Sequence, residues 1–311
     1  MNTTFIIIFH LLVLGMLAID LFVFNRKNHA ISIKESLWWS LVWILLAMAF
    51  NGYIYIDQGS EAALTFLTGY LLEKSLSIDN LFVFILIFSA FHIPRKYQHK
   101  VLFWGILGAI VLRAAFIYAG IALITHFHFT VYILGGILMY SGLAIFRQKD
   151  EPESPEQNTL IRWLSKSLPV SHQQHEGKFW LRHRGKFLFT PLFLALLAIE
   201  ISDIIFAVDS VPAILSITKD PMIAYTSNIF AILGLRALYF AVEGMITQFH
   251  YLKFGLAVIL IFVGLKMLLA DVIDIPIAFS LLFILLALTS ATLISIKSTK
   301  HKEKEKASHG E

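Results

Sequence analysis

The sequence contains no cysteine, and only 15% of its 311 residues are charged. Without cysteine the chain has no disulfides, no thiolate metal ligands and no thiol catalysis. It also lacks a Walker loop, a dinucleotide-binding fingerprint and a Gly-x-Ser-x-Gly motif, so we expect neither enzyme activity nor a cofactor. Soluble domains carry roughly 25% charged residues. The low charge and the 58% hydrophobic residues therefore predict that the apolar side chains face a lipid bilayer.

Nine apolar stretches approach the length that an α-helix needs to cross a bilayer, roughly 20 residues. They cover approximately residues 5–24, 37–56, 64–89, 101–124, 130–146, 187–216, 223–246, 252–270 and 275–296. If the N-terminus lies outside, every lysine and arginine between these stretches except Lys219 falls on the inner side. Because cytoplasmic loops retain Lys and Arg, the sequence predicts an all-α, multi-pass membrane protein with a cytoplasmic C-terminus. The net charge of +4 is then a topology signal, and no nucleic-acid partner is expected.

Two parts of the chain repeat one polar pattern in the same order. The matching elements are Glu73-x5-Asp79-Asn80 with Asp203-x5-Asp209-Ser210, Arg113 with Arg236, and Gly142 with Gly264. Each copy contains three predicted helices, an odd number, so the two copies enter the membrane from opposite sides. Inverted repeats of this kind place a substrate site near the bilayer midplane, between the copies.

The repeat divides the chain into six predicted regions. These are two N-terminal helices in 1–60, the first three-helix repeat in 61–147, a charged cytoplasmic loop in 148–186, the second repeat in 187–271, a last helix in 272–296 and a cytoplasmic tail in 297–311.

Carboxylates inside the predicted spans are the strongest functional signal. Each costs at least about 2.5–3.5 kcal/mol at the centre of a spanning helix, and several together need protons or a cation to neutralise them. The predicted metal site combines four carboxylates with two neutral oxygen ligands: Glu73, Asp79, Asp203 and Asp209, with Asn80 and Ser210. Oxygen ligands without cysteine favour Mg, Ca or Mn and do not separate these three.

Helix geometry limits this prediction. At 100° per residue, Asp79 and Asp209 lie about 120° away from the first acid of their motifs, so a regular helix does not aim both acids at one point. We expect local unwinding, which Pro212 favours in the second copy because it frees a carbonyl near Asp209.

A structural reading of the acids is ion pairing. We expect Arg113 and Arg236 to pair with one acid each, which leaves acids without a basic partner. Glu200 is a further intramembrane acid, and Glu243 either pairs with Arg236 or lines an outer path. Asn228 is a helix-packing or kink residue, or else a ligand.

Together with the run Thr-Ser-Asn-Ile-Phe-Ala-Ile-Leu-Gly-Leu-Arg at 226–236, these motifs resemble the TerC family, in particular its Alx-like members. The resemblance implies a bacterial inner-membrane protein linked to manganese export, and it implies that the six predicted ligands form the family's proposed metal site. It also implies a link, in some relatives, to the assembly of membrane proteins.

The leading hypothesis is a secondary transporter that moves Mn(II) out of the cytoplasm, with protons as the counter-ion. The alternative is an assembly or scaffold factor whose intramembrane acids form structural ion pairs. A third hypothesis, an intramembrane aspartyl protease, is disfavoured because the expected Gly-x-Gly-Asp pattern is absent.

Overall fold

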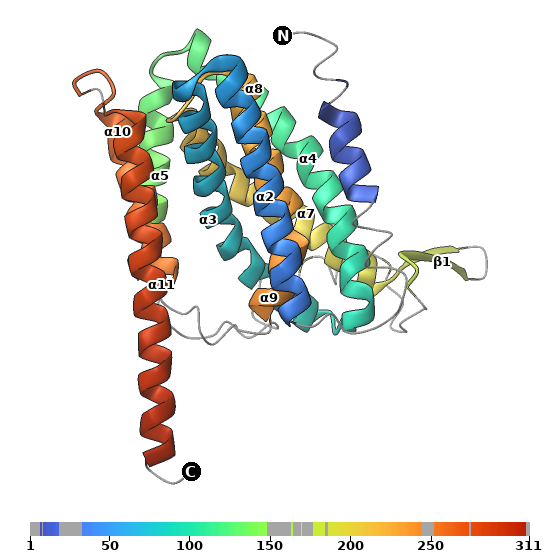
Figure 1. Cartoon of the computed structure of the whole chain (residues 1–311). Coiled ribbons are helices and arrows are strands. Elements are labelled where there is room, and N and C mark those ends of the chain that lie inside the picture. The colour runs from blue at the N-terminus through green and yellow to red at the C-terminus, as the bar shows by residue number, and fades with distance from the viewer. Residues whose placement is uncertain are drawn as a thin grey trace.

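Apolar stretches of the sequence fold into helices in the computed structural model, which describes residues 7, 9–18, 33–147, 163, 169, 177–183, 186–243, 252–273 and 275–308. A short helix covers Phe9–Ala18. The longer helices, in chain order, are α2 (Ile33–Gln58), α3 (Ser60–Ala90), α4 (Arg95–His126), α5 (Thr130–Arg147), α7 (Pro191–Leu215), α8 (Pro221–Leu233), α9 (Leu235–Glu243), α10 (Leu252–Leu268) and α11 (Ile277–Ser308). An antiparallel hairpin of β1 (Trp180–His183) and β2 (Lys186–Phe189) precedes α7 (Figure 1).

Several of these helices can span a bilayer. Within the described ranges, four are long and apolar enough to cross a membrane: Lys34–Gln58, Arg95–His126, Pro191–Leu215 and Ile277–Ser295. The bent pair α8 and α9 makes a fifth candidate span. Of the other predicted spans, α3 is long but carries charged residues in its interior, and α5 and α10 are short at 18 and 17 residues. The chain is therefore a multi-pass, helical membrane protein, as the sequence predicts.

The helix break lies at a different place from the predicted one. Both α3 and α7 are continuous through their acidic motifs, so the expected unwinding beside Asp79 and Asp209 is wrong. Pro212 lies in the last turn of α7, where it precedes the end of the helix instead of opening its middle. The break separates α8 from α9 at Gly234, with a bend of 41°.

Lys74 of α3 lies at this break. Its Nζ donates a hydrogen bond to the carbonyl oxygen of Ala231 at 3.1 Å, in the last turn of α8. A Cβ added at Gly234 would lie 2.9 Å from the same Nζ and 3.1 Å from Cβ of Trp43. The absence of a side chain at position 234 therefore leaves room for the lysine and for α2 beside the bend.

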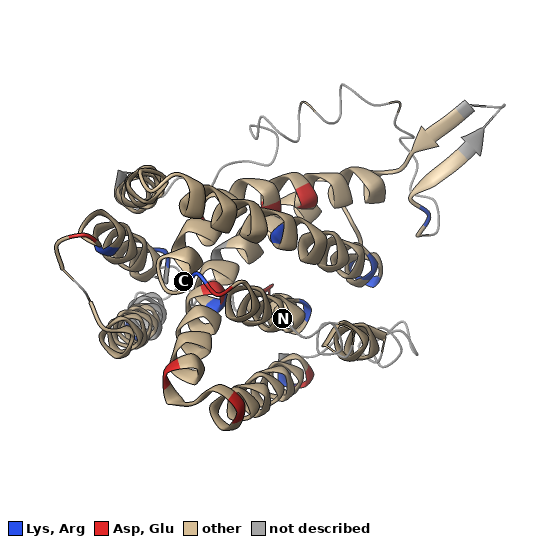
Figure 2. Ribbon diagram, turned by 90° about the horizontal axis from the view of Figure 1, so that it is seen from above, with Lys and Arg blue, Asp and Glu red and all other residues tan. Residues whose placement is uncertain are grey.

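The helices that carry the acidic motifs pack at the centre of the bundle. α3 packs against α7 and α8, α4 packs against the same two helices, and α5 packs along α10. α2 covers α3, α8 and α9, while α11 lies against α10 and α3. Viewed from above, acidic and basic positions occur on helices inside the bundle as well as at its edge (Figure 2).

α5 and α10 approach each other closely enough for their backbones to touch. A Cβ added at Gly135 would lie 3.0 Å from the carbonyl oxygen of Gly264, and one added at Gly142 would lie 2.8 Å from that of Ala257. The residue numbers of the contacts increase along α5 while they decrease along α10, so the two helices are antiparallel. Small residues commonly permit such close approach between membrane helices.

Candidate functional site

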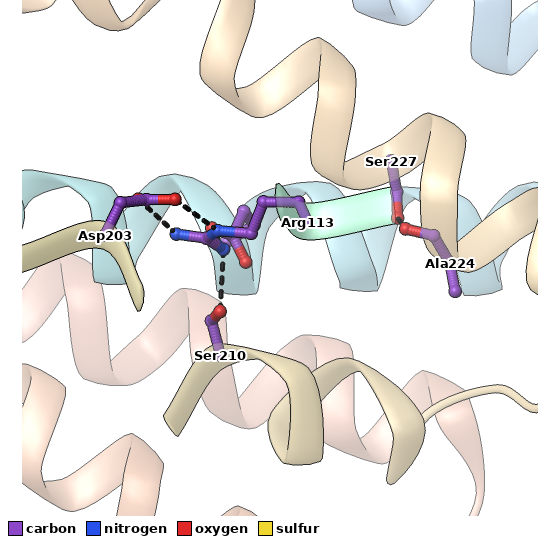
Figure 3. A network of polar contacts seen from close by, with 6 residues as sticks. Arg113, Asp203, Ser210, Ala224 and Ser227 are labelled. Carbon is purple, nitrogen blue, oxygen red and sulfur yellow. Dashed lines mark hydrogen bonds and ion pairs between the residues drawn. The ribbon is translucent and has the colours of Figure 1, made fainter. Parts of the chain in front are cut away.

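Arg113 of α4 is the centre of a buried polar cluster. Its Nε and Nη2 donate to the two carboxylate oxygens of Asp203 on α7, at 3.2 Å and 3.0 Å. Its Nη1 donates to Oγ of Ser210, also on α7, at 2.6 Å, and to the carboxylate of Glu73 on α3. Figure 3 shows the guanidinium between Asp203 and Ser210. The two-point contact with Asp203 fixes the plane of the guanidinium.

The cluster is almost fully removed from solvent. Arg113 and Glu73 are each 1% exposed, and Asp203 is 5% exposed. When all three side chains are ionised, the group carries one more negative charge than positive charge. An uncompensated charge in a buried position is strongly unfavourable, so a proton or a further cation at this place would stabilise the group.

A small cavity lies against this cluster. It has a volume of about 10 Å³ and is lined by Arg113 and Asp203, by Ser77 and Asn80 of α3, and by apolar side chains of α4, α7, α8 and α9. Roughly 10–15 Å³ is the volume that admits one water-sized sphere. The cavity is thus large enough for a single water or a bare metal ion, with hydroxyl, amide and carboxylate groups around it.

Two buried side chains near the centre of the bundle have unsatisfied polar atoms. Glu73 Oε2 and both amide atoms of Asn228 have no hydrogen-bond partner among the residues that the structure describes. Asn228 lies on α8 and is 1% exposed. Because buried polar groups in native proteins are nearly always hydrogen-bonded, these atoms favour the interpretation of Asn228 as a ligand over that of a packing residue. Of these atoms, the two oxygens, Glu73 Oε2 and Asn228 Oδ1, are chemically suited to a hard cation.

Asp209 has a hydrogen-bond partner outside the Arg113 cluster. Its carboxylate accepts a hydrogen bond from Oγ of Ser141 on α5 at 2.7 Å. Because α7 stays helical between Asp203 and Asp209, the two acids lie on different faces of the helix. Asp79 lies on α3, but its side chain is outside the part of the chain that the structure describes.

The structure describes three further residues of the predicted site, Glu243, Arg236 and Glu200. Glu243 pairs with Arg95 at 3.3 Å, near the start of α4, instead of with Arg236 as one of the two expectations has it, and the place on an outer path stays a prediction. The reason is distance along the helix, since Arg236 lies two turns before Glu243. Arg236 is 1% exposed. The carboxyl group of Glu200, on α7, lies against Gly108 of α4. A Cβ added at Gly108 would lie 2.5 Å from the carboxyl carbon of Glu200.

Arg113 does not pair with a single acid as predicted, because it contacts both Glu73 and Asp203. Within the described ranges, no three His, Asp or Glu side chains gather closely enough to hold a metal ion. The oxygen groups of the cluster and its cavity are mixed in kind: the carboxylates of Glu73 and Asp203, the amide of Asn80, and the hydroxyls of Ser77 and Ser210.

Sequence reasoning did not identify Ser77, Ser141 or Gly108. A hydroxyl inside a predicted span is a usable signal for the two serines, because a polar side chain in the bilayer needs a partner. Gly108 has no such signal, since its role depends on the neighbouring helix.

Comparisons with known proteins agree with one another. The profile of the integral membrane protein TerC family matches residues 58–304. An uncharacterized membrane protein of Myxococcus xanthus is 46% identical over 289 residues, which cover 93% of this chain and 91% of that protein. The proposed membrane-bound redox modulator Alx of Salmonella typhi is 43% identical over 306 residues, covering 96% and 95%. Its counterpart in Escherichia coli K12 is 45% identical over 282 residues, covering 88% of each chain. No solved structure matches the chain.

Proposed function

The chain belongs to the integral membrane protein TerC family, and from this premise we propose that it is a secondary transporter that exports a hard divalent cation, Mn(II), from the cytoplasm. The observation that carries the proposal is the buried cluster of Arg113 with Glu73 and Asp203, whose acids outnumber their basic partner. A transported cation can supply the missing positive charge, and the mixed oxygen groups suit a hard divalent ion. The choice of manganese among such ions rests on the family resemblance.

In this proposal the cation binds where polar atoms lack partners. Glu73 Oε2 and the amide of Asn228 provide oxygens that no described residue uses. Asn80 and Asp203 line the cavity beside the cluster, which is large enough for a single water or a bare metal ion. Arg113 holds the carboxylates between transport cycles, and the cation competes with the guanidinium for them. Protons exchanged at the same carboxylates would provide the opposing gradient that an exporter needs.

We further infer nine membrane spans and two inverted three-helix repeats, 61–147 and 187–271. Helix packing supports the repeats. If the two copies are symmetric, α3 corresponds to α7 and α4 to α8, so the contact between α3 and α8 should have a counterpart between α7 and α4. Both contacts are present. The difference in residue number that matches Gly142 with Gly264 also matches Gly135 with Ala257. The close approach of Gly135 to Gly264 therefore has a symmetric counterpart in the close approach of Ala257 to Gly142. An inner-membrane location with an external N-terminus completes the proposal, on the distribution of Lys and Arg.

The relatives named Alx are described as proposed redox modulators. This chain contains no cysteine, so any redox effect of its own would not use thiol chemistry. The alternative function, an assembly or scaffold factor, treats the Arg113 cluster as a structural ion pair. The unsatisfied atoms of Glu73 and Asn228 favour transport over this alternative, because a purely structural network is stable when every member has a partner.

The test is cellular manganese content, measured by elemental analysis in metal-loaded cells at matched membrane abundance of each variant. We expect the wild-type protein to lower cellular manganese and Glu73→Gln and Asp203→Asn to lose this effect. Glu61→Gln is the matched control, because Glu61 is exposed in the first turn of the same helix as Glu73. Normal export by both cluster variants would remove these acids from the mechanism. Unchanged manganese with every variant, wild type included, would favour the assembly factor.

A further inference from the structure

One face of the β1–β2 hairpin is aromatic, and the part of it farther from α7 is exposed. Trp180 is paired with Phe189 and Arg182 with Phe187. Because cross-strand partners and alternate residues share one side of a hairpin, Trp180, Phe187 and Phe189 lie on the same face. Phe189 stacks on Phe193 of α7 at a ring distance of 4.5 Å. Trp180 and Phe187, in contrast, are 59% and 63% exposed.

The base of the hairpin is fixed to the bundle. Thr190, which precedes α7, donates through Oγ1 to the carbonyl oxygen of Lys178 at 2.7 Å and through its backbone N–H to that of Phe179 at 3.1 Å. Lys100 of α4 donates to the carbonyl oxygen of Gly177 at 2.7 Å, and its Nζ lies 5.0 Å from the ring centre of Phe179. The aromatic face is therefore held in one orientation relative to α4 and α7.

The hairpin lies near the end of the bundle at which α4 begins. Lys100, which contacts its base, is five residues from Arg95, and five residues of helix rise about 7.5 Å. Arg95 begins α4 and its side chain is 64% exposed. Figure 1 shows the hairpin projecting sideways from the bundle, toward the end where α4 begins, and Figure 2 shows the same projection from above. Amphipathic elements buried roughly 5–10 Å below the surface lie at the boundary of headgroups and acyl chains.

The charge of the segment indicates which lipids would surround it. Residues 177–186 include four Lys or Arg and no Asp or Glu. We propose that the hairpin is an interfacial anchor that binds the anionic phospholipid headgroups of the cytoplasmic leaflet, with Trp180 and Phe187 inserted among the lipids. Aromatic side chains favour this zone, and basic residues near the surface add attraction to anionic lipids. Since Thr190 joins the hairpin to α7, the anchor fixes the helix that carries Asp203 relative to the bilayer surface.

The absence of native cysteine permits a direct test with single introduced thiols. Phe187→Cys and Leu188→Cys are adjacent positions on opposite faces of β2, so each is the control for the other. Each variant is labelled with an environment-sensitive fluorophore and reconstituted in phosphatidylcholine vesicles with or without phosphatidylglycerol. We expect F187C to show a blue shift and strong quenching by lipids that carry a nitroxide near the headgroup. Label at L188C should be quenched less by these lipids, and phosphatidylglycerol should increase quenching at F187C.

A second variant tests the contribution of the basic residues to lipid binding separately from their contribution to folding. Neutralising Arg182, Arg184 and Lys186 to Gln should remove the dependence on phosphatidylglycerol while the elution profile in detergent stays unchanged. Equal quenching at the two positions, or quenching of F187C by aqueous iodide but not by lipid nitroxides, overturns the proposal. A blue shift at F187C without lipid quenching overturns it as well, since the face is then covered by protein.

Discussion

Arg113 on α4 faces Asp203 on α7 through two hydrogen bonds, Nε to Oδ2 at 3.2 Å and Nη2 to Oδ1 at 3.0 Å, and it shares its remaining Nη1 between Glu73 and Ser210. One guanidinium thus serves two carboxylates. The effect of replacing Arg113 therefore depends on which other positive charge can neutralise Glu73 and Asp203.

Arg113→Gln should therefore make the protein less stable and more dependent on metal. Removing one partner of a buried ion pair costs about 3–5 kcal/mol, so we expect a lower Tm in detergent. Added Mn(II) should raise the Tm of this variant by more than that of the wild type, because the cation can then neutralise Glu73 and Asp203. Thermal unfolding over a series of Mn(II) concentrations measures both effects.

Arg113→Lys is the matched control for this prediction. It keeps the charge but loses the two-point contact with Asp203, so its Tm should lie between those of the wild type and Arg113→Gln. If Mn(II) leaves the Tm of Arg113→Gln unchanged, the proposed competition between the guanidinium and a cation is contradicted.

Gly108→Ala should act by displacing the carboxylate of Glu200. The new Cβ would lie 2.5 Å from the Glu200 carboxyl carbon, and the end of a flexible side chain moves more easily than backbone. We expect Gly108→Ala to lower the Tm slightly when Glu200 is present and to leave the Tm unchanged when Glu200 is replaced by Ala. A double-mutant cycle with both substitutions measures the coupling. Simple additivity of the two changes would contradict the contact.

Two adjacent glycines on α5 should respond oppositely to alanine. A Cβ at Gly135 would lie 3.0 Å from both Gly264 O and Met267 Cβ, whereas one at Gly136 would meet nothing within 4 Å. Gly135→Ala should lower stability by about 1–3 kcal/mol through overpacking. Gly136→Ala should be neutral or stabilising by up to about 1 kcal/mol, the helix preference of Ala over Gly. Equal Tm values for the two variants would contradict the close α5–α10 contact.

Coupling to protons predicts that efflux responds to a pH gradient. In proteoliposomes loaded with Mn(II), a gradient that drives protons in the direction opposite to the metal should accelerate its exit. Asp203→Asn should show no such acceleration. Efflux that is indifferent to the imposed gradient would exclude proton exchange and leave the cation site to be tested separately.

The sequence predicted part of the site because buried charge is informative. Glu73, Asp203 and Ser210 were expected together from the repeated motif, and all three contact Arg113. The family predicted from the motifs is confirmed by the family match. The metal ligation of the six residues, and of Asp79 in particular, stays a prediction.

Other features depend on how helices face each other, which the chain alone does not specify. Asp209 and Ser141 meet because α5 lies beside that face of α7, and no local pattern at either residue indicates the partner. The helix break was expected near Pro212, since proline disrupts helices. It occurs at Gly234, where Lys74 and Trp43 of other helices occupy the space that a side chain would need.

The hydrogen bond from Lys74 to Ala231 changes how charges inside the bilayer should be counted. A helix that ends within a bundle exposes carbonyl oxygens with a partial negative charge, and here an ammonium group is directed at one of them. That lysine is engaged with backbone, so it is less available to balance a carboxylate. A tally of acidic and basic residues in the spans consequently overstates how well the acids are neutralised. Any interrupted membrane helix with a nearby lysine calls for the same correction before its surplus of acids is judged.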